Sequence, residues 1–156
     1  MKEAIFSLLV FSLTISGCAT TGPRVFPPSA SPESAWKLAI GRDGKRFTGI
    51  LLVRVEDDGL AMVVIDPTGI TLIGGRVDNS GRVTVNDGLA RVRKSGLGPF
   101  VGRALYRIFI ASGRKAREGC LKGMGLLRYY ETCRKPGTIL LDNPWPEPDL
   151  RLSAVK

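Results

Sequence analysis

The chain has 156 residues, of which 44% are hydrophobic, and a formal net charge of +9 with no histidine. This length suits one domain with a real core, and the missing histidines exclude Ser-His-Asp and Cys-His catalytic arrangements and the commonest metal ligand. The sequence also has neither a dinucleotide-binding glycine fingerprint nor a GxxxxGK[ST] phosphate loop. We therefore expect a protein that is not an enzyme and that needs no cofactor or metal.

The N-terminal segment has the pattern of a lipoprotein signal peptide. The apolar run at positions 4–15 is too short to span a bilayer, which takes about 20 apolar residues. The letters ISGC at positions 15–18 resemble the lipobox of bacterial lipoproteins. The resemblance implies that residues 1–17 are removed and that Cys18 carries acyl chains, which anchor the protein in a membrane. The alternative is an ordinary secretory signal with a chance cysteine near its cleavage site.

Residues 18–34 comprise the cysteine to be lipidated and a linker of small, polar and proline-rich residues. Such a composition cannot bury enough apolar surface to order itself, so we expect a flexible spacer. Ala19 is not the Asp that, by the same resemblance, favours retention at the inner membrane, which points to the outer membrane facing the periplasm. The remaining residues, 35–156, are predicted to form a single domain.

The positive charge indicates which partners suit this domain. A basic surface favours anionic groups such as phospholipid or lipopolysaccharide head groups. Nucleic acid is the other usual partner of a basic protein, but an exported, lipid-anchored domain would rarely meet it. We therefore predict a membrane partner and no nucleic acid.

The first element predicted along the chain is a short helix at residues 31–41, SPESAWKLAIG, because a proline begins it and a glycine ends it. The segment that follows has β-branched and aliphatic runs broken by Asp-Gly, Pro-x-Gly and Asn-Asp-Gly turns, which predicts a meander. Its predicted strands span residues 47–55, 60–66, 70–77, 82–85 and 89–93.

Side-chain alternation in this meander predicts an apolar surface. The first strand has one wholly apolar face, and the second strand, LAMVVID, is apolar on both faces. A strand of that kind is either covered on both sides or lines a greasy cavity. The strand residues that we expect to line a hydrophobic ligand are Leu51, Val53, Met62, Val64 and Leu72.

Residues 95–113, SGLGPFVGRALYRIFIASG, predict an amphipathic helix with Pro99 near its start and Gly113 beyond its end. Its apolar side, which includes Phe100, Leu105 and Phe109, would lie over the sheet and complete the ligand lining. Two interpretations stay open. The helix is either a lid over a bound ligand or a plug that fills the core.

The C-terminal third combines a basic segment with further strands. Residues 113–125, GRKAREGCLKGMG, are basic and glycine-rich and predict a solvated loop. Residues 126–132, 138–142 and 150–155 predict strands, whereas NPWPEPD at 143–149 cannot be regular because proline removes backbone donors.

Cys120 and Cys133 are the only thiols besides Cys18. In an oxidising compartment such a pair indicates a structural disulfide, which would contribute about 3 kcal/mol for a loop of this length. The alternative is two free thiols. A zinc site would need further Cys or His residues, which the chain lacks.

Residues 58–106, about a third of the chain, resemble the middle of the LolA/LolB-like lipoprotein carriers. In both, a hairpin is followed by a strand ending in a Pro-x-Gly turn, a further strand, and a helix opened near a glycine and a proline. The resemblance implies an α+β fold, in which one or two helices cover a curved antiparallel sheet that forms an incomplete β-barrel over an apolar cavity. No specific transfer residue is carried over from the family.

Two functions follow from these features. The first is a periplasm-facing lipoprotein that binds an acyl chain or another hydrophobic ligand, in lipid or lipoprotein transport. The alternative is a non-enzymatic accessory lipoprotein with a filled core, which holds protein partners of an envelope complex.

Overall fold

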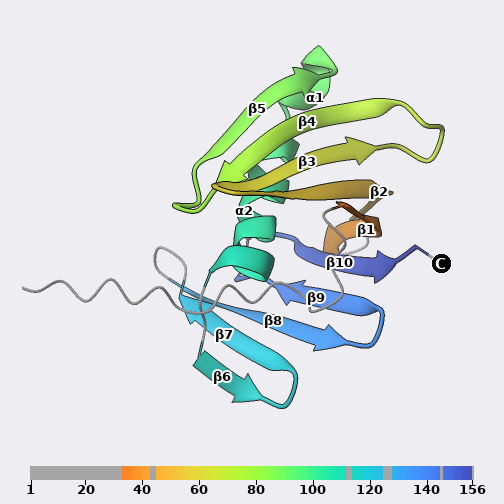
Figure 1. Cartoon of the computed structure of the whole chain (residues 1–156). Helices are drawn as coiled ribbons and strands as arrows, with labels where there is room; N and C mark the ends of the chain where they lie inside the picture. The colour runs from red at the N-terminus through yellow and green to blue at the C-terminus, as the bar shows by residue number, and fades with distance from the viewer. Residues whose placement is uncertain (1–32, 43–44, 112–113, 125–127, 145, 156) are drawn as a thin grey trace, which may run out of the picture.

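The structure, a computed structural model, describes residues 33–42, 45–111, 114–124, 128–144 and 146–155 (Figure 1). The predicted signal peptide, Cys18 and most of the predicted linker lie outside the described residues. Among the described residues, no helix is long and apolar enough to cross a membrane.

The described strands form one antiparallel sheet of ten, with β5 and β6 at its two edges. From edge to edge the order is β5-β4-β3-β2-β1-β10-β9-β8-β7-β6, so the chain runs outward from β1 to one edge, crosses through the helices, and returns from the other edge. The strands are β1 (Glu33–Arg42), β2 (Lys45–Glu56), β3 (Gly59–Ile65), β4 (Thr71–Asp78), β5 (Val83–Gly88), β6 (Arg114–Arg117), β7 (Cys120–Met124), β8 (Tyr129–Lys135), β9 (Thr138–Asp142) and β10 (Asp149–Ala154).

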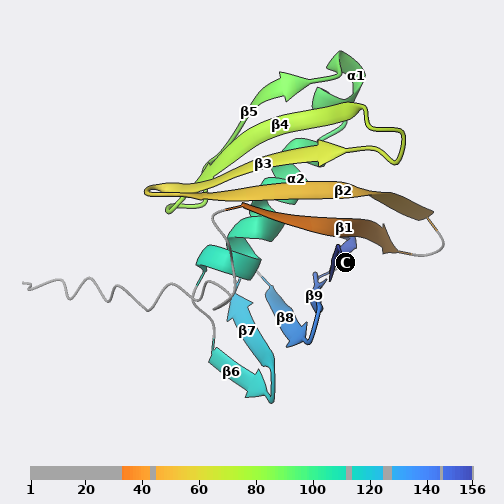
Figure 2. The ribbon, with the colours of Figure 1, turned by 45° about the vertical axis from the view of Figure 1, so that its right-hand side comes forward.

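Three helical segments connect β5 to β6: α1 (Ala90–Arg93), α2 (Leu97–Leu105) and the π-helix η1 (Tyr106–Ile110). Helix α2 crosses one face of the curved sheet (Figures 1 and 2). We call this the covered face and the opposite one the open face. The predicted α+β class with an open, curved antiparallel sheet and short helices is therefore confirmed.

The predicted helix at residues 31–41 is wrong, because its described residues, 33–41, belong to the central strand β1. Trp36, Leu38 and Ile40 alternate toward the covered face, with period 2 instead of 3.6. Both edges of β1 are used, since it pairs with β2 on one side and β10 on the other. These distant partners override the local helix signals. The strand also takes in residues 33 and 34, which were predicted to be linker.

Two further predictions are wrong. Residues 89–93 are not a strand: the Leu89 amide donates a last bond to the Leu72 carbonyl (3.0 Å), after which α1 begins. The basic segment 113–125 is not a loop, since it contains β6 and β7 joined at Gly119, whose φ of 69° suits glycine. Backbone pairing of β7 with β8 decides this outcome in spite of the charge and glycine content.

The other predicted elements are confirmed within a few residues. Strands β2 to β5 and β8 to β10 lie where alternation and turn residues place them, and α2 with η1 occupies the predicted amphipathic helix. The described part of the NPWPEPD segment, apart from Asp149 in β10, is irregular as predicted. The turns after β3 and β4 are closed by Asp66 and Asp78, whose carboxylates accept backbone N–H bonds two and four residues ahead.

Helix α2 lies very close to β5 because two glycines face that strand. A Cβ atom at Gly102 would come within 2.4 Å of Val83 Cγ1, and one at Gly98 within 2.6 Å of Val85 Cγ2. The absence of these side chains lets the remaining apolar residues of α2 reach the covered face, where they join one continuous hydrophobic cluster with the strands.

Candidate functional site

The eight residues predicted to line a hydrophobic ligand come together on the covered face. All of them are buried members of a single hydrophobic cluster, and they come from β2, β3, β4, α2 and η1. These residues are Leu51, Val53, Met62, Val64, Leu72, Phe100, Leu105 and Phe109. The structure thus brings these strand and helix residues together in one cluster on the covered face.

The helix side chains fill the space over these strands. Leu105 is fully buried and Phe109 is 5% exposed, and Phe109 also meets Trp36 of β1 with ring centroids 6.5 Å apart. A ligand that used this surface would have to displace part of α2 or η1. The open face, in contrast, has two unfilled hollows. One of about 440 Å³ crosses β1, β10 and β9, and one of about 340 Å³ crosses β1, β2 and β3.

The covered face changes character on β8. Tyr130, Thr132 and Arg134 alternate toward η1, in contrast to the aliphatic residues of β2 and β3. Cross-strand pairing confirms this orientation, because Thr132 lies opposite the buried Leu141 of β9. The Arg134 guanidinium donates from Nη2 to the backbone carbonyl of Ile108 in η1 at 2.6 Å. The enclosed face is thus apolar from β4 across to β9, which we call its apolar half, and it carries polar and cationic groups at its β8 end, which we call its polar half.

Thr132 is the most enclosed polar residue of this second half. It is 2% exposed, and its Oγ1 atom has no hydrogen-bond partner in the described part of the protein. A buried hydroxyl of this kind is uncommon, since leaving it unsatisfied costs about 1–3 kcal/mol.

Arg107 of η1 provides a second, partly buried cation at the same end of the covered face. Its side chain is 13% exposed, and Nη1 donates to Asn143 Oδ1 at 2.6 Å and to Glu147 Oε2 at 2.5 Å. The guanidinium carbon lies 5.1 Å from the centre of the Tyr130 ring, which is a cation–π geometry.

The loop between β9 and β10 holds the acidic partner of Arg107 in place. Asn143 donates from Nδ2 to the Pro148 carbonyl at 2.7 Å, and its backbone N–H donates to Asp149 Oδ1 at 3.1 Å. The Glu147 amide donates to the Pro144 carbonyl at 3.0 Å. These bonds fix a proline-bounded loop from which the half-exposed Glu147 reaches Arg107.

Burial sets the electrostatics of this cluster. It lowers the pKa of Arg134 from its usual range. It also raises the pKa of the Tyr130 phenol, an effect that the positive charge of Arg107 opposes. Arg107 and Arg134 bring two guanidinium groups to the polar half of the covered face, and such groups suit an anionic ligand.

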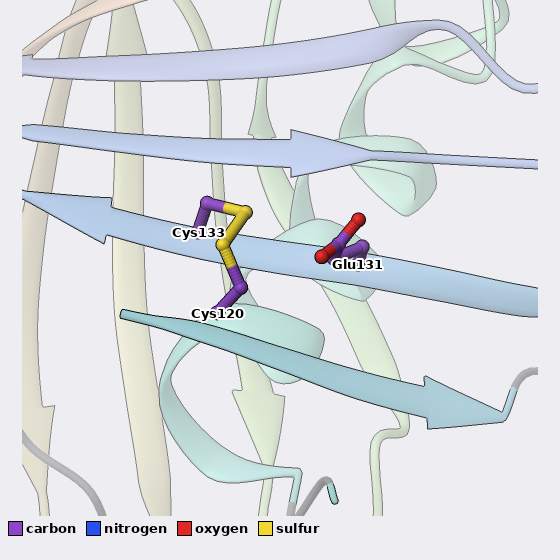
Figure 3. Close-up of side chains that lie close together, drawn as sticks. All are labelled: Cys120, Glu131 and Cys133. Carbon is purple, nitrogen blue, oxygen red and sulfur yellow. A yellow bond between two sulfur atoms is a disulfide. The ribbon is translucent and has the colours of Figure 1, made fainter. Parts of the chain in front are cut away.

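The predicted pairing of Cys120 with Cys133 is confirmed. The two cysteines are directly opposite each other on β7 and β8 and form a disulfide, with Glu131 beside it on the open face (Figure 3). The two sulfur atoms and a carboxylate oxygen of Glu131 lie within 4.8 Å of one another. Thiolates are the ligands that a soft metal needs, and the disulfide takes up both sulfurs.

The sequence did not reveal the polar half of the covered face. Alternation in RYYETCRK would group Tyr130, Thr132 and Arg134, but only the pairing of β8 with β9 shows that this side faces inward. Arg107 falls within the predicted amphipathic helix 95–113 but outside the apolar residues singled out there. Its contact with Glu147 spans 40 residues and has no local signal.

Comparison with known protein families and with curated proteins finds no match for this chain.

Proposed function

We propose that this chain is a lipid-anchored protein of the bacterial envelope whose domain binds an acyl chain with an anionic head group. The fold is an open, curved antiparallel sheet covered by a helix, and this is the arrangement expected from the resemblance to the LolA/LolB-like carriers. We extend the proposal to a role in moving lipids or lipoproteins through the periplasm. Acylated Cys18 would hold the domain on the membrane, most simply the outer one.

The observation that carries the binding proposal is the change of polarity along one enclosed face. The apolar half, represented by Leu51 and Met62, offers the environment of a hydrocarbon chain, whereas Arg107 and Arg134 lie at the other half. A guanidinium binds carboxylate and phosphate oxygens well, so these two arginines suit an anionic head group. An amphipathic ligand matches both halves.

The packed interior means that binding must be coupled to movement of α2. The helix occupies the space that an acyl chain would take, and its apolar residues stand in for that chain in the closed form. Closure and binding therefore compete for the same surface.

The experiment that tests this proposal uses residues 19–156, which include every described residue. Native mass spectrometry of the purified protein and uptake of a fluorescent fatty acid are expected to show one bound lipid. A protein that purifies without lipid and takes up no fatty acid would contradict binding. The anchor is tested separately with a Cys18→Ser variant, which should no longer sediment with membranes. A variant that still sediments with membranes would contradict the proposed lipid anchor and location.

A second function rests on the open face. Ile50 and Leu52 are exposed there on β2, at 37% and 39%, and Leu52 lines the hollow of about 340 Å³. Exposed apolar residues beside a hollow suit a protein partner, as expected of an accessory lipoprotein of an envelope complex. Crosslinking in cells distinguishes the two functions, because one dominant protein partner without bound lipid favours the accessory role.

A further inference from the structure

We infer that Arg107 and Thr132 form a subsite for the anionic head group of the ligand, and that in the closed form Glu147 occupies the Arg107 side of this subsite as an internal competitor. This inference rests on the proposed function and adds to it the place and chemistry of head-group recognition. The group recognised is an anionic oxygen, as in a carboxylate or a phosphate.

Arg107 is already bonded to an anionic oxygen in the closed form. A guanidinium binds carboxylate and phosphate oxygens in preference to other groups because its donors form a planar fork. In the closed form one of these donors, Nη1, is bonded to the carboxylate of Glu147 at 2.5 Å. Glu147 thus supplies the oxygen that a fatty acid or a lipid phosphate would supply.

The buried hydroxyl of Thr132 is a second feature of the subsite and is independent of Arg107. Its hydroxyl is enclosed, has no hydrogen-bond partner in the described residues, and projects from β8 between Tyr130 and Arg134 on the covered face. A hydroxyl both donates and accepts, and an anionic oxygen placed beside it would satisfy its donor. Arg107, which stacks on the Tyr130 ring, marks the same stretch of β8.

The subsite adjoins the apolar half of the covered face. Leu141 lies beside Thr132 on the next strand, and Phe109 follows two residues after Arg107 in η1. Both belong to the continuous hydrophobic cluster of the covered face. A ligand with its head at Arg107 therefore has an apolar surface along which its chain can lie.

Glu147 is closer to solvent than Arg107, which favours its release when a ligand binds. Its side chain is 31% exposed, compared with 13% for Arg107. It stands on a proline-bounded surface loop, so it can return to water at little cost when another anion replaces it. Arg107 remains paired before and after the exchange, which avoids leaving a buried charge alone.

The experiment compares three probes of the same chain length on residues 19–156: a fatty acid, a lysophosphatidic acid and a fatty alcohol. Removing the competitor with Glu147→Gln should raise the affinity for the two anionic probes by about tenfold, the size expected for one charge-assisted hydrogen bond. Thr132→Val should lower the same affinities, and neither substitution should alter binding of the alcohol. Glu33→Gln, which removes an equal charge from an exposed residue of the open face, serves as the matched control.

The outcomes separate the two proposals. If the wild type binds the fatty acid but Glu147→Gln leaves its affinity unchanged, or raises the affinity for the alcohol equally, the subsite is overturned and the binding function stands. If no probe binds to any variant, the proposed function itself fails. The anionic probe that gains more from Glu147→Gln identifies carboxylate or phosphate as the preferred head group. Adding Arg107→Gln to Glu147→Gln should abolish this gain. If a protein with Arg107→Gln does not fold, the double variant Glu147→Gln with Thr132→Val is used instead, and its gain should be smaller than that of Glu147→Gln alone.

Discussion

The fit of helix α2 against β5 can be tested by adding a single methyl group. Gly102 lies inside the helix, where an alanine Cβ would meet Val83 Cγ1 at 2.4 Å and Val83 Cγ2 at 2.7 Å. Both distances are below any normal contact between carbon atoms. The valine is β-branched and has little rotamer freedom with which to avoid the methyl group, so Gly102→Ala must push the helix away from the sheet.

Two opposing terms set the size of the effect. Replacing glycine by alanine within a helix stabilises it by about 1 kcal/mol. Inserting a carbon into a packed interface costs about 1–3 kcal/mol. We therefore expect Gly102→Ala to lower the free energy of unfolding by about 1 kcal/mol. In a Val83→Ala background the clashing Cγ atoms are gone, and the same substitution should then raise it by about 1 kcal/mol.

Urea denaturation followed by circular dichroism measures these four proteins as a double-mutant cycle. The predicted coupling between the two positions is about 2 kcal/mol, with a change of sign. Arg103→Ala, on an exposed position of the same helix, should change stability by less than about 0.5 kcal/mol and controls for general effects on the helix. Stabilisation by Gly102→Ala of equal size in both backgrounds would refute the close contact of α2 with β5.

The remaining predictions concern the disulfide, two turn carboxylates and the helix as a lid. Replacing Cys120 and Cys133 together by serine should lower the free energy of unfolding by about 3 kcal/mol, measured in urea, because the bridge closes a short loop. Hydrogen bonds, above all from the Thr68 and Ser80 hydroxyls, lower the pKa of Asp66 and Asp78 below the usual 3.8, so these groups stabilise the fold above that pH and the contribution is lost as the pH falls through their folded pKa values. Their Asn variants should therefore lose less stability on acidification, and an unchanged acid limb of the stability profile would contradict this. Finally, Gly102→Ala should bind a fluorescent fatty acid more tightly than the wild type if the helix is a lid, and no more tightly if it is a plug.

Much of the sheet was predictable because its signals are local. Alternation in β2 and β3 and the turns at Asp66 and Asp78 depend on residues within a few positions of each other. The amphipathic pattern of α2 is equally local, and for this reason its apolar side could be expected to lie against the sheet.

The errors arise where distant strands decide the structure. The sequence at 31–41, most of which becomes β1, contains a proline and a glycine suited to a helix, and its apolar residues fit either period. Its pairing with β10, more than 100 positions away, fixes it as a strand. The basic segment that becomes β7 is likewise defined by β8, through the Cys120–Cys133 pair and its neighbours. Local propensity is a weak guide when a segment lies between two long-range partners.

The polar half of the candidate site was hidden for the same reason. Arg134 and Thr132 look like ordinary surface residues until the inward side of β8 is known, and Glu147 acquires a role only through its contact with Arg107.

A lid and a plug differ in whether weakening the closed position of the helix also strengthens ligand binding. In the closed form the apolar residues of α2 cover the surface that an acyl chain needs, so the observed affinity equals the affinity of the open form multiplied by its population. A substitution such as Gly102→Ala, which weakens the closed form by about 1 kcal/mol, then increases a small open population by about fivefold and the affinity with it. A plug has no such coupling, because displacing it unfolds the core and lowers stability without exposing a binding surface. Stability and affinity measured on the same variants therefore distinguish the two: opposite changes identify a lid, and a loss of stability without any gain in binding identifies a structural helix.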